Sequence, residues 1–199
     1  IADCDVEADV VIDFSSPVCT DALLDWCADK QVPVVECTTG LSEAQLARIK
    51  ETSAKVAVLK SANMSMGINL LEKLLKEAAE AGYDIEIVEK HHKLKKDAPS
   101  GTALALGDAI NEGLSEKYEY VFDRSQRSIP RPQKEIGFSA VRGGTIVGDH
   151  DVIFAGEDEV ITFSHRAYSK AVFGKGAVQA AKFLCGKQPG LYDMSDVIG

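Results

Sequence analysis

Val-Val-Ile-Asp-Phe-Ser-Ser-Pro, at residues 10–17, sets the architecture of the first part of this chain. The run begins as a short apolar segment interrupted only by Asp13, which indicates a buried strand. Ser15, Ser16 and Pro17 then begin a helix that is expected to continue to about residue 29. A strand followed at once by a helix is the repeating unit of parallel sheets.

Two further strands are expected at residues 33–38 and 56–60. The first of them runs into Thr39-Gly40, after which Ser42 and Gln45 have the spacing of a capping box for a second helix. Strands that alternate with helices, with a polar turn after each strand, predict a parallel sheet. In such sheets the ligand lies beyond the carboxyl ends of the strands.

The pattern changes after residue 65. Mixed helical and alternating patterns replace the strand–helix repeat, which predicts a second, α+β domain with a mostly antiparallel sheet. The expected elements are a helix from 68 that ends at Gly82, a half-buried strand over 84–92, a helix over 99–112, a long loop over 115–135, an antiparallel meander of three strands over 136–167 and a closing helix over 175–185.

A basic segment lies in the second half of the chain, although the formal net charge is -9. Residues 90–96 contain four lysines and two histidines, and Pro99 and Ser100 then begin a helix. The N-terminus of a helix attracts anions, and neighbouring lysines strengthen that attraction. We therefore expect a site for a carboxylate or phosphate. His91 and Lys95 also suit proton delivery, because histidine exchanges a proton near neutral pH and lysine is an acid beside it.

Less specific interpretations of this segment stay open. It could be a solvated loop that balances acidic neighbours, or a contact for a polyanion. A metal site is not expected. His91 and His92 are adjacent on an expected strand and so face opposite sides, and His150 and His165 are the only other imidazoles.

Composition limits the class of protein. A chain of 199 residues with 45% hydrophobic content can bury one good core or two small ones. Its five cysteines are scattered without a C-x-x-C pair, which indicates reduced buried thiols. No signal peptide is expected, so the expected compartment is the cytoplasm. No apolar run is long enough to span a bilayer, and the acidic charge disfavours nucleic acid, so neither is expected as a partner.

Several short motifs follow one another along the chain in a characteristic order. The most specific is Glu-Lys-His-His-Lys-Leu-Lys-Lys-Asp-Ala-Pro-Ser-Gly-Thr-Ala at 89–103. Weaker ones are the run at 10–17, Cys-Thr-Thr-Gly at 37–40, Ala-Asn-Met-Ser-Met-Gly at 62–67, Arg-Gly-Gly-Thr-Ile-Val-Gly-Asp-His at 142–150 and Gly-Leu-Tyr-Asp-Met at 190–194. Together they resemble the dihydrodipicolinate reductase family of lysine and diaminopimelate biosynthesis, over essentially the whole chain.

The resemblance implies an oxidoreductase that passes a hydride from NADH or NADPH to a cyclic dicarboxylate, a dihydrodipicolinate-type substrate, giving tetrahydrodipicolinate. It implies that His91 donates or accepts a proton and that Lys95 donates one. The residues implied to bind the substrate carboxylates are His92, Gly101 and Thr102. Those implied to lie along the cofactor are Cys37, Thr38, Thr39, Ser61, Ala62, Asn63 and Met64.

The resemblance also implies a discontinuous domain organisation. Residues 1–62 and 167–199 are expected to form a Rossmann-like dinucleotide-binding domain, and residues 63–166 a domain for substrate binding and homotetramer assembly. Members of the family begin with a strand and a Gly-rich turn for the cofactor pyrophosphate, which the residues before Val10 do not supply. We therefore expect the parallel-sheet domain to be incomplete at its N-terminus.

A second hypothesis follows from that expectation. A homologue without the Gly-rich turn would be catalytically silent and would act only as an assembly or interaction module. Cofactor binding separates this hypothesis from the reductase.

Overall fold

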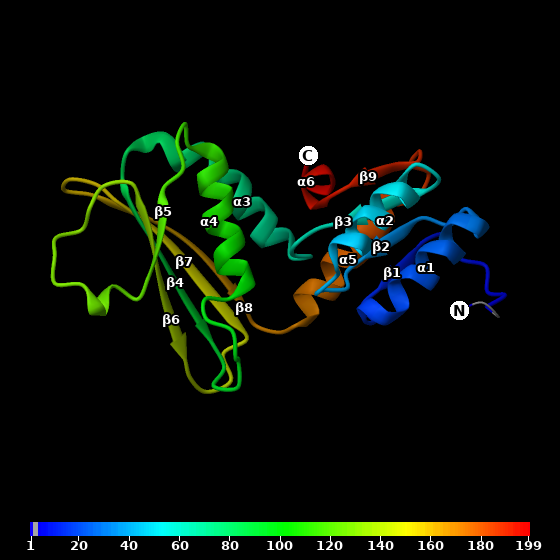
Figure 1. Cartoon of the computed structure of the whole chain (residues 1–199), viewed down its shortest axis with the longest axis horizontal. Coiled ribbons are helices and arrows are strands. Elements are labelled where there is room, and N and C mark those ends of the chain that lie inside the picture. Colours follow the sequence, from blue (N-terminus) through cyan, green and yellow to red (C-terminus); the bar gives the residue numbers. More distant parts are fainter. Residues whose placement is uncertain (2–3) are drawn as a thin grey trace. The chain divides into compact units, whose positions relative to one another are not determined.

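The computed structural model describes residue 1 and residues 4–199, which form two compact units. Unit 1 comprises Ile1–Met66 and Phe173–Gly199, and unit 2 comprises Gly67–Val172 (Figure 1). The chain therefore leaves unit 1, builds unit 2, and returns to complete unit 1.

Unit 1 contains a four-stranded sheet in which all pairs are parallel. Its strands, in spatial order, are β1 (Val11–Asp13), β2 (Val34–Glu36), β3 (Ala57–Lys60) and β9 (Gly190–Tyr192). The first three strands are joined by helices, as the alternating sequence pattern predicts for parallel neighbours. The helices of unit 1 are α1 (Pro17–Lys30), α2 (Glu43–Ser53), α5 (Ala171–Leu184) and α6 (Met194–Ile198).

Helices cover both faces of this sheet. Because alternate residues of a strand point to opposite faces, Val34 and Val58 pack with side chains of α1 and α2, whereas Val35 and Leu59 pack with those of α5 and α6. All four strand residues are fully buried. The predicted capping box of Ser42 and Gln45 is present at the start of α2. The Rossmann-like parallel-sheet fold expected from the sequence is confirmed.

Unit 2 contains a five-stranded mixed sheet with the order β5-β6-β4-β7-β8. Two pairs are parallel and two are antiparallel. The strands are β4 (Asp84–His91), β5 (Glu119–Phe122), β6 (Glu135–Arg142), β7 (Gly148–Ala155) and β8 (Val160–Ala167). The central strand is β4, so its residues have neighbours on both sides.

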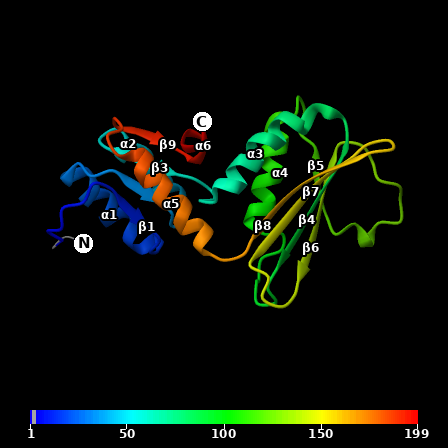
Figure 2. The ribbon, with the colours of Figure 1, turned by 180° about the vertical axis from the view of Figure 1, so that it is seen from behind.

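Two helices, α3 (Met66–Ala78) and α4 (Gly101–Gly113), cover one face of this mixed sheet, as Figures 1 and 2 show. Their buried side chains share a core with Ile85 and Ile87 of β4 and with neighbours on β6 and β7. A short 3-10 turn (Ala79–Ala81) extends α3, and Gly82 ends it with a left-handed conformation at φ 78°. Of the apolar stripe predicted over 68–82, Ile68, Leu71 and Leu75 are buried, whereas Leu74 is exposed.

The structure differs from the sequence-based prediction in three places. The predicted loop over 115–135 contains β5 and a 3-10 turn at Arg124–Gln126, and the end of the chain adds β9 and α6. The strands predicted over 136–167 do form, but they are not a simple meander, because β4 lies between β6 and β7. In the described part of the chain, no helix combines the length and apolarity that a membrane crossing requires.

Candidate active site

His91 lies at the carboxyl end of β4. The strand alternates buried and less buried residues, so Ile85, Ile87, Glu89 and His91 share its buried face. The first two belong to the core, while the last two place a carboxylate and an imidazole at the end of that face. His91 is 8% exposed and Glu89 is 1% exposed. The strand period therefore brings together two ionisable groups that are two residues apart.

Glu89 collects hydrogen bonds from three directions. Its Oε2 atom is 2.6 Å from His91 Nδ1, and its Oε1 atom accepts from the backbone N–H of Ser100 at 3.0 Å. Arg142 donates to both oxygens, at 2.8 and 2.7 Å. Burial raises the pKa of Glu89, but the hydrogen bonds from Arg142 and His91 outweigh it and hold that pKa below its usual value. Glu89 is therefore ionised at neutral pH.

The strands on either side of β4 place two further residues, Arg142 and His150, beside Glu89 and His91. Arg142 lies opposite His91 in the parallel pairing with β6, and His150 lies opposite Glu89 in the antiparallel pairing with β7. The rings of His91 and His150 meet edge to face with centroids 5.2 Å apart. Burial and the nearby His91 lower the pKa of His150 to about 4, so its ring is neutral at neutral pH.

Ser100 begins α4 next to this cluster. Its hydroxyl accepts from the backbone N–H of Ala103 at 3.2 Å and lies 3.0 Å from His150 Nε2. Gly101 and Thr102 are the first residues after this cap, and Gly101 is exposed. A Cβ added at Gly101 would meet nothing within 4 Å, so the backbone at the helix start is open to approach. The Glu89 carboxylate binds the N-cap residue Ser100, so it lies next to the positive end of the α4 dipole.

The loop after β4 carries Lys95 and His92. The Lys95 amine lies 2.9 Å from a carboxylate oxygen of Asp97, and the Lys95 side chain is 21% exposed. Arg142 donates to the Asp97 backbone carbonyl at 2.7 Å, which ties this loop to the Glu89 cluster. His92 is half-buried. Five sequence-predicted residues, His91, His92, Lys95, Gly101 and Thr102, therefore lie in unit 2, from the end of β4 to the start of α4.

The seven residues predicted for the cofactor line a cavity of about 440 Å³ in unit 1. It is formed by the segments that follow β1, β2 and β3, together with Phe173 of α5. Hydroxyl side chains such as Thr38 and Ser61 line it beside apolar ones such as Met64. The cavity therefore offers a ligand both hydrogen-bonding and apolar surface. Burial raises the pKa of the Cys37 thiol to about 12, so Cys37 contributes a neutral surface and no nucleophile.

Charged residues stand behind this cavity at the strand ends. Thr38 donates its hydroxyl to Asp13 at 3.1 Å and its backbone N–H to Glu36 at 2.8 Å, and its carbonyl accepts from Lys60 at 3.0 Å. These contacts fix the Thr38 backbone through both of its polar groups. Among the residues that the structure describes, no group of three or more His, Cys, Asp or Glu is arranged to hold a metal ion.

Comparison with known proteins assigns the family. The family profile described as "Dihydrodipicolinate reductase, N-terminus" matches residues 1–64, and the one described as "Dihydrodipicolinate reductase, C-terminus" matches residues 67–198. The chain belongs to the dihydrodipicolinate reductase family. The profile boundary falls close to the division between the two structural units after Met66.

Individual reductases are similar over most of the chain. A 4-hydroxy-tetrahydrodipicolinate reductase of Caldanaerobacter subterraneus is 58% identical over 96% of this chain and 77% of its own length. One from Clostridium novyi is 51% identical over 100% of this chain and 79% of its own length. A solved structure, dipicolinate-bound dihydrodipicolinate reductase from Paenisporosarcina sp. TG-14, matches with a TM-score of 0.76 and 26% identity, covering 93% of this chain and 71% of that one.

Sequence reasoning missed several residues of the cluster around His91. Glu89 is on the same strand face as His91, so the period of two was a signal that could have found it. Ser100 was recognised only as a helix start, and Arg142 only as the first residue of the motif at 142–150. Arg142 and His150 reach the site through sheet pairing over long sequence distances, and the strand patterns alone carry no signal for that pairing.

Proposed function

We propose that this chain reduces a dihydrodipicolinate-type cyclic dicarboxylate to tetrahydrodipicolinate with NADH or NADPH, as an oxidoreductase of lysine and diaminopimelate biosynthesis. One observation carries the proposal: the carboxylate of Glu89 binds both the His91 ring, which can exchange a proton, and the exposed start of α4. Family membership supports the same reaction.

The substrate carboxylates bind at the start of α4. A helix N-terminus attracts anions, and Gly101 lets a ligand approach the backbone because no side chain intervenes. Thr102 follows as the second helical residue, and His92 and Lys95 add donors from the preceding loop. The solved relative whose printed title states that dipicolinate is bound supports a dicarboxylate of this type.

His91 and Lys95 manage the proton that the reduction consumes. His91 gives its Nδ1–H to the ionised Glu89, which leaves Nε2 as the atom that exchanges a proton with the substrate. Lys95 is a second acid, kept near the site by its ion pair with Asp97. A cation at this position also offsets the negative charge of a dicarboxylate.

The nicotinamide cofactor binds in unit 1. When bound, it supplies the hydride that reduces the substrate ring. The residues that would hold it are those lining the cavity at the strand ends: Cys37, Thr38, Thr39, Ser61, Ala62, Asn63 and Met64. The hydrogen bonds that fix the Thr38 backbone keep this wall of the cavity in place.

The enzyme assembles as a homotetramer through residues 136–166 and works in the cytoplasm. Exposed apolar side chains on this segment, Val141, Val160 and Ile161, support an assembly surface. The five cysteines are all free, as in a reducing compartment. A molar mass from light scattering tests the tetramer.

The test of the reaction is the consumption of NADH or NADPH by the purified chain in the presence of the substrate. His91→Gln keeps a donor for Glu89 but cannot exchange the proton, and Lys95→Ala removes the second acid. Each change should lower turnover by about a hundredfold or more.

The matched control is Lys134→Ala, whose amine pairs with Glu116 and which precedes β6 at the opposite end of the sheet from His91. This variant should keep the wild-type rate. A wild-type chain that assembles but consumes neither cofactor would favour the silent assembly module. Equal rates in the wild type and both site variants would remove the proposed roles of His91 and Lys95.

A further inference from the structure

Glu89 receives four hydrogen bonds and has no capacity for more. Its Oε1 accepts from Ser100 N and Arg142 Nη2, and its Oε2 accepts from His91 Nδ1 and Arg142 Nη1. An ionised carboxylate offers about four lone-pair sites, and here each of them faces a donor. Only a carboxylate satisfies this environment, because every neighbouring group gives a hydrogen.

The proton position on His91 follows from this arrangement. An ionised carboxylate accepts only, so the neutral His91 ring must carry its hydrogen on Nδ1. Its Nε2 atom faces a glycine, and a Cβ added to Gly148 would lie 3.1 Å from that nitrogen. The charged and titratable groups around the ring are Glu89 on β4, Arg142 on β6 and the neutral His150 on β7.

The same carboxylate also fixes the helix start. Oε1 of Glu89 binds the backbone N–H of Ser100, the capping residue of α4, and Gly101 follows directly. One rigid group therefore sets both the ring that moves a proton and the helix end that attracts an anion. Arg142 neutralises the buried carboxylate with two hydrogen bonds, so that its charge does not repel a dicarboxylate ligand.

We infer that Glu89, held by Arg142, is a positioning residue that fixes the tautomer of His91 and holds that ring in a fixed position relative to the start of α4. The inference rests on the proposed function, because it gives the His91 Nε2 atom its task. Neither Glu89 nor Arg142 touches the reacting atoms in this account. Both act through His91 and through Ser100.

The decisive variant is Glu89→Gln. The amide oxygen can still accept from Ser100 and Arg142 Nη2, but the amide NH₂ then faces His91 Nδ1 and the donor Arg142 Nη1. The hydrogen bond from Arg142 Nη1 is lost, and His91 Nδ1 is the one of these two atoms that can become an acceptor for the amide. His91 therefore moves its hydrogen from Nδ1 to Nε2, the atom that exchanges the proton. Loss of the correct tautomer should lower kcat by about a hundredfold to ten-thousandfold, the upper figure being that of the Asp→Asn change in the serine protease triad. KM should change by about threefold or less, because the helix start is still held.

Nitrogen NMR of the His91 ring shows which ring nitrogen carries the hydrogen. If Glu89 had only a structural role, its replacement would not change this tautomer. In the wild type, neutral His91 should carry its hydrogen on Nδ1, and in Glu89→Gln on Nε2. The matched control is Glu86→Gln on the same strand, whose carboxylate accepts from Arg124 and Arg131 and belongs to a separate cluster. It should leave kcat and the His91 tautomer unchanged.

The outcomes separate this inference from the proposed function. A wild-type ring that carries its hydrogen on Nε2 overturns the inference without any variant, including the case in which Glu89→Gln fails to fold. An active wild type that His91→Gln inactivates, with an unchanged kcat in Glu89→Gln, overturns the positioning role and leaves the reductase standing. A tautomer switch in a chain that consumes no cofactor supports the positioning role and contradicts the reductase.

Discussion

His150 shows how burial by a neighbouring strand sets the charge of a single residue. It is 4% exposed, and its Nε2 atom contacts the Ser100 hydroxyl. Burial is the main cause of its low pKa, and the nearby His91 lowers it further. Because the ring must stay neutral to remain buried, His150 fills the space beside His91 without adding positive charge.

This pKa predicts how stability depends on pH. The pKa of His150 is about 4 in the folded chain and 6.5 ordinarily, so between these values the unfolded chain binds more protons. The free energy of unfolding should therefore fall as the pH falls from 6.5 towards 4, and His150 alone should account for about 3 kcal/mol of that loss. Chemical denaturation of the wild type and of His150→Phe at neutral pH and near pH 4 measures it.

The variant isolates His150 from carboxylates that titrate in acid, because both chains keep Glu89 and its partners. His150→Phe should lose less stability than the wild type on acidification. An identical pH dependence in the two chains would show that His150 is not held neutral by the fold.

At the scale of elements, the close packing of α5 on the segment after β3 shapes the cavity of unit 1. A Cβ added at Gly176 would lie 1.7 Å from the Met64 carbonyl oxygen, which is a backbone atom that cannot rotate away. A Cβ added at Gly174 in the same helix would meet nothing within 4 Å. Gly176 is therefore required by contact with a segment that lines the proposed nicotinamide cavity, whereas Gly174 is not.

Two alanine variants test this difference. Gly176→Ala should lower the free energy of unfolding by about 2 kcal/mol or more, because helix and loop must separate. Gly174→Ala should raise it by up to about 1 kcal/mol through better helix propensity. Thermal or chemical unfolding of both variants gives the answer, and a similar change in the two would contradict the packing described for α5.

Local signals explain which elements and site residues could be predicted. Strong alternation identified β4, and cap residues identified the starts of α2 and α4, so the sequence already placed His91 and Lys95 close to the start of α4. β5 was missed because it is a short edge strand in which Val121 alone is buried. The insertion of β4 between β6 and β7 depends on pairing between distant segments, and so does the arrival of Arg142 and His150 at the site.

At the scale of the whole molecule, the proposed function gives the two units different chemical tasks. Unit 1 has its own cores on both faces of a parallel sheet and the cavity at the strand ends. Unit 2 has a separate core under α3 and α4 and carries the ionisable cluster around His91. A division of this kind is typical of nicotinamide enzymes, in which the cofactor and the substrate are held by different domains.

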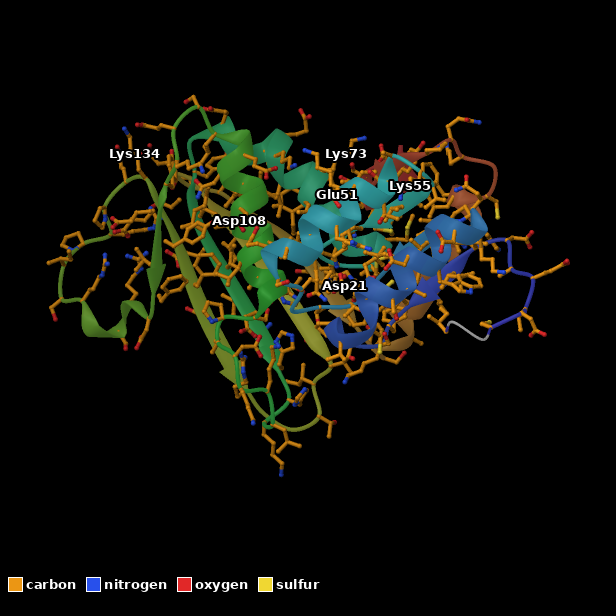
Figure 3. All side chains as sticks on the ribbon, turned by 45° about the vertical axis from the view of Figure 1, so that its right-hand side comes forward. Asp21, Glu51, Lys55, Lys73, Asp108 and Lys134 are labelled. Carbon is orange, nitrogen blue, oxygen red and sulfur yellow. The ribbon has the colours of Figure 1, made fainter. Side chains whose placement is uncertain are left out.

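In the proposed function, unit 2 binds a cyclic dicarboxylate between Lys95 and the start of α4. Calorimetric titration with dipicolinate tests it in the wild type, in Lys95→Ala and in the control Lys134→Ala. Lys134, labelled in Figure 3, precedes β6 at the opposite end of the sheet from His91. We predict binding by the wild type, the same affinity in Lys134→Ala, and an affinity about tenfold or more lower in Lys95→Ala. A wild-type chain that binds no dipicolinate, or equal affinities in all three proteins, would contradict the account.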